Sequence, residues 1–374
     1  MNNPKVIVVS AVNLTEGGTL TVLKGALRML SETYGHNSNY KIIALVHDKR
    51  LCDYLNVEYI CFPNVKKSWI NRVYFEYFFL KKLSKKLKVY LWFSLHDITP
   101  NVIAEKRVVY CHNATPFYKI QLRDFYFSKK ITLFSLFYKY LYRINIKRNS
   151  FVVVQQNWIR NEFASMFGLS KKKIIVATPN RTLTTIPPVT EKDTNNQTPF
   201  QFFYPSLPRT FKNFELLCEA TKILSKMTHI IFETVITISG NENSYSRWFF
   251  EKYKDVPQIK FVGLLSHEQV SDYYHSIDCL VFPSKLETWG LPISEFIPYD
   301  KPMLVADLEY AHETTAGVQK VGFFNPNSAQ DLADKMLLLI NGEQSFLKYC
   351  HKLRIEEPCV SSWEELFELL LQNK

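Results

Sequence analysis

Apolar runs rich in β-branched residues alternate with amphipathic patterns along the first half of the chain. We expect strands at the runs KVIVVSA, YKIIALVH, VEYICF, VYLWFSL, RVVYCHN, SFVVVQQ and KIIVATPN. The stretch TVLKGALRMLSETY, between the first two runs, has the spacing of a helix with one apolar face. Continuous apolar strands that alternate with helices are typical of a parallel sheet covered on both faces. The pattern therefore predicts a doubly wound α/β domain.

The alternation stops at residues 183–199 and starts again after them. These residues are polar, rich in Thr and Pro, and without an apolar period, which is typical of a linker. Beyond them we expect strands at QFFYPS, TVITISG, IKFVGLL, CLVFPS and PMLVAD, with helices between them. We therefore predict two Rossmann-like, doubly wound domains, at residues 1–182 and 200–361, which face a cleft. The last helical pattern, at residues 362–374, is expected to pack back on the first domain.

Composition limits the class of protein. The chain has 374 residues, of which 47% are hydrophobic, and this is enough to fill two cores. It contains no run of about 18 apolar residues, so no membrane span is expected, and its first residues favour a strand over a signal peptide. The seven cysteines form no C-x-x-C pair, which argues against a disulfide framework and against a structural zinc site. We therefore expect a cytoplasmic protein.

The positive charge is concentrated in two segments of the first domain, residues 66–88 and 119–148. Together they carry a net charge of +14, against +11 for the whole chain. Both have helical patterns, and two explanations of their aromatic residues stay open. Either the rings face the core while the lysines are solvated, or rings and lysines form a surface that contacts anionic lipid at the inner face of the cell membrane. No nucleic-acid-binding motif is present, so a nucleic acid partner is not expected. The aromatic residues concerned are Trp69, Tyr74, Tyr77, Phe78, Phe125, Tyr126, Phe127, Phe134, Phe137 and Tyr138.

Two glutamates flank a turn after the predicted strand CLVFPS, in the stretch ETWGLPISE. Pro292 suits the first position of a helix, which places Glu287 on the loop and Glu295 in the first helical turn. Gly290 allows backbone to come close to a ligand. Free amides at a helix start suit a phosphate, and carboxylates accept hydrogen bonds from sugar hydroxyls. A glutamate in a first turn also stabilises a helix without any ligand, so the spacing alone leaves both explanations open.

Other residues with suitable chemistry follow predicted strands. Gly17 and Gly18 lie between the first strand and a helix, a favourable place for an anion. The stretch is not G-x-G-x-x-G, which argues against a dinucleotide-dependent dehydrogenase. Arg209 and Lys212, after the first strand of the second domain, carry charges that attract a diphosphate, although solvated loop cations are common. His112 ends a first-domain strand, where a structural role is also common. Similar positions are held by Asn113, His96 and Asp97.

Taken together, these residues resemble the family 4 glycosyltransferases of the GT-B fold. The segment FPSKLETWGLPISEF matches that family's E-x7-E segment, and the match continues in order through KPMLVAD, HETTAG and VGFFNPNSAQDLADKM. The resemblance implies a retaining glycosyltransferase that moves a sugar from a UDP- or GDP-linked donor to a hydroxyl of a glycan or lipid-linked acceptor. It places the enzyme in surface polysaccharide, lipopolysaccharide or glycolipid assembly. No cofactor or metal is expected, since the sequence contains no DxD motif.

The resemblance also implies roles for single residues. Glu295 would bind the ribose of the donor, and Glu287 would contact the transferred sugar. Lys212 and Arg209 would neutralise the diphosphate, and His112 would lie near the reacting sugar. The other donor-binding positions implied are Gly17, Gly18, Gly263, Leu264, Trp289, Gly290 and Leu291.

The sequence departs from the family pattern at three positions. Thr288 stands where the family usually has Gly, Leu207 where it has the Arg of its basic pair, and Asp300 where it has a small residue. Two other functions are kept open. A GT-B sugar-nucleotide epimerase would use the same nucleotide site and would turn over without an acceptor. A non-catalytic membrane-surface scaffold would bind no nucleotide.

Overall fold

The computed structural model describes residues 3–127, 129–179 and 198–372, except for the side chains of three residues in 130–134. The chain forms two compact units. Unit 1 comprises residues 1–117, 135–180 and 355–374, and unit 2 comprises residues 118–134 and 181–354. Most of the predicted linker, residues 183–197, lies outside the described residues. Residues 118–134, which the sequence pattern placed in the first domain, are grouped with unit 2.

Among the described residues, unit 1 contains an eight-stranded sheet with the order β14-β7-β6-β5-β4-β1-β2-β3, and every pair of neighbouring strands is parallel. Each of the apolar runs predicted as a first-domain strand forms one. Strand β1 lies between β2 and β4, so the strand order reverses at its carboxyl end, where ligands of such sheets bind. The strands are β1 (Lys5–Ser10), β2 (Tyr40–Val46), β3 (Val57–Cys61), β4 (Val89–Ser94), β5 (Ala104–Cys111), β6 (Phe151–Val154), β7 (Ile174–Ala177) and β14 (Cys359–Val360).

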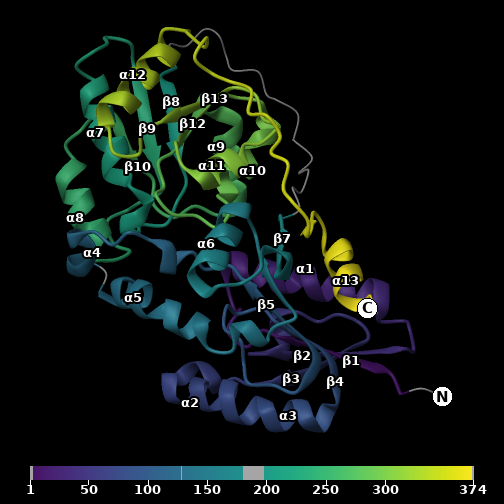
Figure 1. Ribbon diagram of the computed structural model, residues 1–374. Coiled ribbons are helices and arrows are strands. Elements are labelled where there is room, and N and C mark those ends of the chain that lie inside the picture. Colours follow the sequence, from purple (N-terminus) through teal and green to yellow (C-terminus); the bar gives the residue numbers. More distant parts are fainter. Residues whose placement is uncertain (1–2, 128, 180–197, 373–374) are drawn as a thin grey trace. The chain divides into compact units, whose positions relative to one another are not determined.

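Helices cover both faces of the sheet of unit 1 (Figure 1). On one face, α1 (Gly17–Tyr34) and α13 (Trp363–Leu371) pack on each other and on the central strands. On the other face, α2 (Trp69–Tyr74) continues through a π-helix at Phe75–Phe79 into α3 (Leu80–Leu87), which packs on Val8 and Trp92. The remaining longer helices of this part of the chain are α5 (Lys129–Arg143) and α6 (Asn157–Phe167).

Unit 2 contains a six-stranded parallel sheet with the order β10-β9-β8-β11-β12-β13. In chain order within the unit this is 3-2-1-4-5-6, the order of dinucleotide-binding folds. The strands are β8 (Phe200–Tyr204), β9 (Phe232–Ile236), β10 (Ile259–Phe261), β11 (Cys279–Phe282), β12 (Met303–Ala306) and β13 (Val321–Phe324). The fold class predicted from the sequence, two doubly wound α/β domains, is confirmed.

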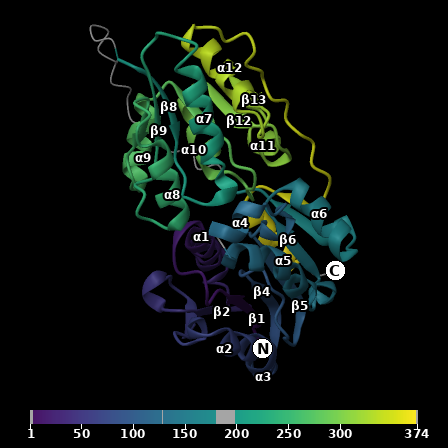
Figure 2. The same cartoon turned by 90° about the vertical axis from the view of Figure 1, so that its left-hand side faces the viewer.

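A helix of unit 2 follows each of its strands, while α4 comes before them in the sequence, and α7 and α12 pack side by side (Figure 2). They are α4 (Leu122–Phe127), α7 (Phe214–Leu224), α8 (Ser244–Tyr253), α9 (His267–Ser276), α10 (Leu291–Phe296), α11 (Glu309–Thr314) and α12 (Ala329–Ile340). Within the described part of the chain, no helix combines the length and the apolarity that crossing a membrane requires.

Candidate functional site

The loops after β8 and β11 bring two of the predicted catalytic residues of unit 2 into contact. The 3-10 turn η7 (Thr210–Lys212) follows β8, and Glu287 lies on the loop after β11. The Lys212 ammonium and the Glu287 carboxylate form a close ion pair, with side chains only 17% and 14% exposed. Strands β8 and β11 are neighbours at the reversal of the strand order, so this pair lies where ligands of doubly wound sheets bind.

The backbone of the η7 turn is fixed by groups from the sheet. The buried Tyr204 hydroxyl donates a hydrogen bond to the Lys212 carbonyl over 2.9 Å. The Lys285 amide donates to the Phe211 carbonyl over 2.8 Å. Asn213, whose backbone is left-handed with φ 59°, donates its side-chain amide to carbonyls of the loops after β11 and β13. These hydrogen bonds tie the turn that carries Lys212 to β8 and to the loops after β11 and β13.

A cavity of about 200 Å³ opens near the carboxyl ends of β8, β9 and β10. Its lining combines Ser206 and Thr237 with apolar residues and with Glu295. The Tyr274 hydroxyl lies 3.3 Å from Glu295 Oε2, and the imidazole Nε2 of His267 lies 3.9 Å from Glu295 Oε1. Burial raises the pKa of the Glu295 carboxyl, while the charge of His267 and the Tyr274 hydroxyl oppose this rise. The cavity thus offers a hydrogen-bonding carboxylate beside apolar walls.

Two details of the turn before α10 differ from the expectation. The helix begins at Leu291, so Pro292 is its second residue and not its first. As a result Glu295 is the fifth residue of the helix and lies beyond its first turn. The helix dipole stabilises a carboxylate only within the first turn, so it does not explain this position. Gly290 immediately before the helix has φ +83°, a left-handed conformation that favours glycine. This geometry turns the chain so that the side chain of Glu295 lines the cavity.

The other donor-binding positions predicted in unit 2 are distributed around these two features. Leu264 lines the cavity, and it follows Gly263, which has φ +73°. Trp289 is buried, and its carbonyl accepts a hydrogen bond from the Thr314 hydroxyl, while Leu291 is exposed. The side chain of Arg209 is exposed and does not take part in the Lys212–Glu287 pair.

Unit 1 holds the remaining predicted residues. His112 follows β5, and its backbone N–H donates to Asp97 Oδ1 over 2.7 Å, while its Nε2 lies 3.5 Å from Asp97 Oδ2. Gly17 and Gly18 were expected in a loop before a helix, but α1 begins at Gly17, so both are its first residues. Gly17 has φ +60°, which makes it the turn into the helix. Among the described residues, no group of three or more His, Cys, Asp or Glu side chains could hold a metal ion.

Solved structures share this architecture over nearly the whole chain. The structure titled lipopolysaccharide outer core galactosyltransferase WaaB is 14% identical, with a TM-score of 0.64 and 91% of each chain covered. A glycosyltransferase from Rickettsia africae is 18% identical, with a TM-score of 0.62 and 91% and 90% covered. Anabaena HepE in complex with UDP and glucose is 12% identical, with a TM-score of 0.58 and 91% and 92% covered. The chain has the GT-B fold.

A sequence family is matched by the second half of the chain. Residues 189–356 match the family described as Glycosyl transferases group 1. This segment contains the Lys212–Glu287 pair and the cavity lined by Glu295. No curated protein matches the sequence at a significant level.

Proposed function

We propose that the protein is a glycosyltransferase that moves a sugar from a nucleoside-diphosphate-sugar to an acceptor hydroxyl. One observation carries the proposal: in the unit that matches the transferase family, a largely buried Lys–Glu pair and a carboxylate-lined cavity lie at the carboxyl end of one sheet. The cavity suits a nucleoside, with Glu295 accepting hydrogen bonds from ribose hydroxyls. Lys212 would meet the diphosphate, and Glu287 the hydroxyls of the sugar. Within the GT-B enzymes we assign it to family 4.

The proposed reaction retains the anomeric configuration. The bond between the anomeric carbon and the diphosphate oxygen breaks, and the acceptor oxygen bonds to that carbon on the same face. The acceptor proton passes to the leaving phosphate oxygen. Negative charge grows on the diphosphate as the bond breaks, and the ammonium of Lys212 is placed to stabilise it in a largely buried site. We propose that no metal is needed, so that turnover persists in excess EDTA; abolition by EDTA with rescue by magnesium would show the opposite.

The donor and acceptor classes are proposed by analogy with the structural neighbours. HepE was solved with UDP and glucose, and WaaB is titled a lipopolysaccharide galactosyltransferase. We therefore propose a UDP- or GDP-linked donor and a glycan or lipid-linked acceptor in surface polysaccharide or glycolipid assembly. The reaction would take place in the cytoplasm, at the inner face of the cell membrane.

The helix formed by α2, the π-helix and α3 supports contact with an anionic membrane. Its first half exposes large apolar side chains, among them Trp69 at 51%, Tyr74 at 58% and Phe78 at 62%. Its second half exposes four lysines and carries no acidic residue. Apolar rings beside a basic face suit an anionic bilayer surface. In the second basic segment Tyr138 is buried, whereas Phe125, Tyr126 and Phe137 are exposed. The side chain of Phe134 lies outside the described residues.

A thermal-shift panel of nucleotide-sugars tests the proposed function. A ligand at 100 times its dissociation constant should add about 2.7 kcal/mol to the free energy of unfolding. The donor found in this way is then incubated with and without candidate acceptors. Transfer only with an acceptor supports the transferase, whereas turnover of the donor alone would indicate the epimerase. A panel without any stabilising nucleotide would leave the non-catalytic scaffold.

A further inference from the structure

Residues 118–134 are built into unit 2 although their neighbours in sequence belong to unit 1. Helix α4 packs on the η7 turn. The rings of Tyr118 and Phe211 lie 6.0 Å apart between centroids, and those of Phe127 and Trp248 lie 5.0 Å apart. The Phe127 carbonyl also accepts a hydrogen bond from the Ser244 hydroxyl over 3.4 Å. Residues 118–127 are thus held at one end against the turn that carries Lys212 and at the other against α8.

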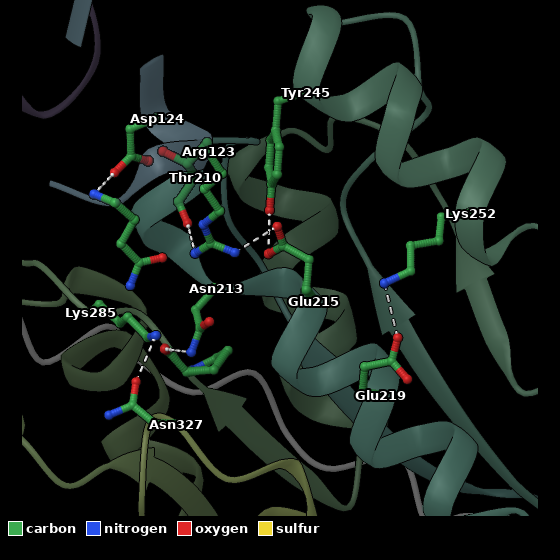
Figure 3. Close-up of polar contacts among 12 residues, drawn as sticks. Arg123, Asp124, Thr210, Asn213, Glu215, Glu219, Tyr245, Lys252, Lys285 and Asn327 are labelled. Carbon is green, nitrogen blue, oxygen red and sulfur yellow. Dashed lines mark hydrogen bonds and ion pairs between the residues drawn. The ribbon is translucent and has the colours of Figure 1, made fainter. Parts of the chain in front are cut away.

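Arg123 is the polar centre of this packing (Figure 3). Its Nη1 donates to Glu215 Oε1 over 2.9 Å, and its Nη2 donates to the Thr210 carbonyl over 3.0 Å. The other Glu215 oxygen accepts from the buried Tyr245 hydroxyl over 2.6 Å. The side chains of Arg123 and Glu215 are only 26% and 12% exposed. A planar guanidinium can satisfy both acceptors at once because its donors form a fixed fork.

With this bond, three consecutive carbonyls of η7 are held by three different parts of the unit. Thr210 accepts from Arg123, Phe211 from the Lys285 amide, and Lys212 from the Tyr204 hydroxyl. Tyr204 is the last residue of β8, and Lys285 lies in the loop after β11. Arg123 is contributed by α4, a separate segment of the sequence. The backbone conformation that directs Lys212 toward Glu287 therefore depends on Arg123 at its first residue.

We propose that Arg123 is a positioning residue for the loop that carries Lys212. Its guanidinium, anchored on Glu215, holds the Thr210 carbonyl so that η7 keeps the conformation in which Lys212 faces the reacting phosphate. The role in turnover rests on the proposed function, but the effect on the loop does not. A lysine in this place has one point charge and no fork, so it cannot hold Glu215 and Thr210 in the same geometry.

Hydrogen exchange of the unliganded protein tests the effect on the loop. The amides of Lys212 and Asn213 donate to the Arg209 and Thr210 carbonyls. In Arg123→Ala they should exchange about tenfold faster, since a charge-assisted hydrogen bond is removed from the turn. The matched control is Lys252→Ala, which removes an ion pair of 3.1 Å to Glu219 on the next turn of α7, away from η7 (Figure 3). The control should leave both amides unchanged.

Steady-state kinetics test the consequence for turnover. Arg123→Ala should lower kcat about tenfold or more with a smaller change in donor KM. Guanidinium ion should restore part of the loss, and ammonium should not. In a Lys212→Ala background the same substitution should add little, because both changes then act on one group. Lys252→Ala should keep the kcat of the parent protein.

The outcomes separate the two proposals. Unchanged exchange at Lys212 and Asn213 in folded Arg123→Ala overturns the positioning role, and so does a kcat loss that adds fully to that of Lys212→Ala. Faster exchange in a protein that transfers no sugar from any donor would remove the proposed function and keep the positioning role. If Arg123→Ala does not fold, Arg123→Lys gives the same comparison, with faster exchange expected and unchanged exchange contradicting the proposal.

Discussion

Lys212 combines a positive charge with a largely buried position beside Glu287, and the rings of Phe211 and Phe282 lie 5.7 and 5.9 Å from its ammonium. In such surroundings an ammonium stabilises a developing anion far better than it would in water. Lys212→Ala should therefore lower kcat about hundredfold while changing donor affinity less. Steady-state kinetics and calorimetric donor binding give the two quantities. A loss confined to donor affinity would mean that Lys212 binds ground state and transition state equally.

Glu295, the proposed ribose-binding residue, is expected to lower the stability of the fold. Burial raises its pKa above the ordinary value of 4.5, so between that value and the raised one the native state holds more protons than the unfolded state. Stability therefore falls as pH rises through this window, and the loss persists above it. Glu295→Gln should therefore have a higher Tm than the parent protein at pH 7.5, and this difference should disappear near pH 4. The same substitution should weaken the binding of a nucleoside diphosphate. Scanning calorimetry at both pH values, with a binding titration, checks this. An unchanged nucleotide affinity would return Glu295 to a structural role.

At the scale of elements, the close contact of α1 and α13 depends on one glycine. A Cβ at Gly25 would lie 2.6 Å from Trp363 Nε1, and the Trp363 ring is held by Tyr110 at 5.8 Å and Phe93 at 6.4 Å between centroids. Overpacking costs about 1–3 kcal/mol and the helix propensity gained is about 1 kcal/mol, so Gly25→Ala should destabilise the protein by up to about 2 kcal/mol. Urea denaturation measures the change.

The matched variant for this contact is Gly25→Ala combined with Trp363→Leu. Trimming the ring makes room for the new methyl group, so the double variant should lose less stability than the two single changes together. If the stability lost by the double variant equals the sum of the two single losses, the contact between residue 25 and the Trp363 ring does not contribute to stability.

Most elements could be predicted because their apolar runs are long and contain many β-branched residues. Strands β1 and β2 are such cases. The two-residue β14 has no such run, and the start of α10 was misplaced because the left-handed Gly290 caps the helix one residue before the position that Pro292 suggested. The π-helix at Phe75–Phe79 has no sequence signal that separates it from the α-helices on either side.

At the scale of the whole molecule, one topological rule made it possible to predict the candidate site from the sequence. Lys212 and Glu287 are 75 residues apart, but both follow strands of one parallel sheet, and loops at the carboxyl ends of neighbouring strands meet. Tyr274 and Arg123 could not be found in this way. Tyr274 lies within a helix, and the partners of Arg123 are 87 and 92 residues away in the other half of the sequence. Such contacts depend on tertiary packing, which no local pattern encodes.

The concentrated positive charge leads us to predict that the protein binds anionic membranes. We expect it to sediment with vesicles that contain anionic lipid at low salt, and to dissociate as salt rises, since the Debye length falls to about 3 Å at 1 M. Each lysine near such a surface contributes about 1 kcal/mol. Changing Lys82, Lys85 and Lys86 of α3 to Gln should therefore weaken binding about hundredfold. The variant should keep its affinity for the nucleotide, because these lysines belong to unit 1 and the cavity belongs to unit 2.

Unit 1 offers a control with the same loss of charge. Lys171, Lys172 and Lys173 are exposed on a 3-10 turn without an aromatic residue among them. Their change to Gln removes three charges from the same unit, so long-range attraction falls equally in both variants. If the surface formed by α2 and α3 contacts the bilayer, the α3 variant should lose much more binding than the control. Trp69→Ser should weaken the part of the binding that persists at high salt. Equal losses in the two lysine variants would indicate attraction by net charge alone. A parent protein that ignores anionic vesicles at low salt would favour an acceptor that is free in solution.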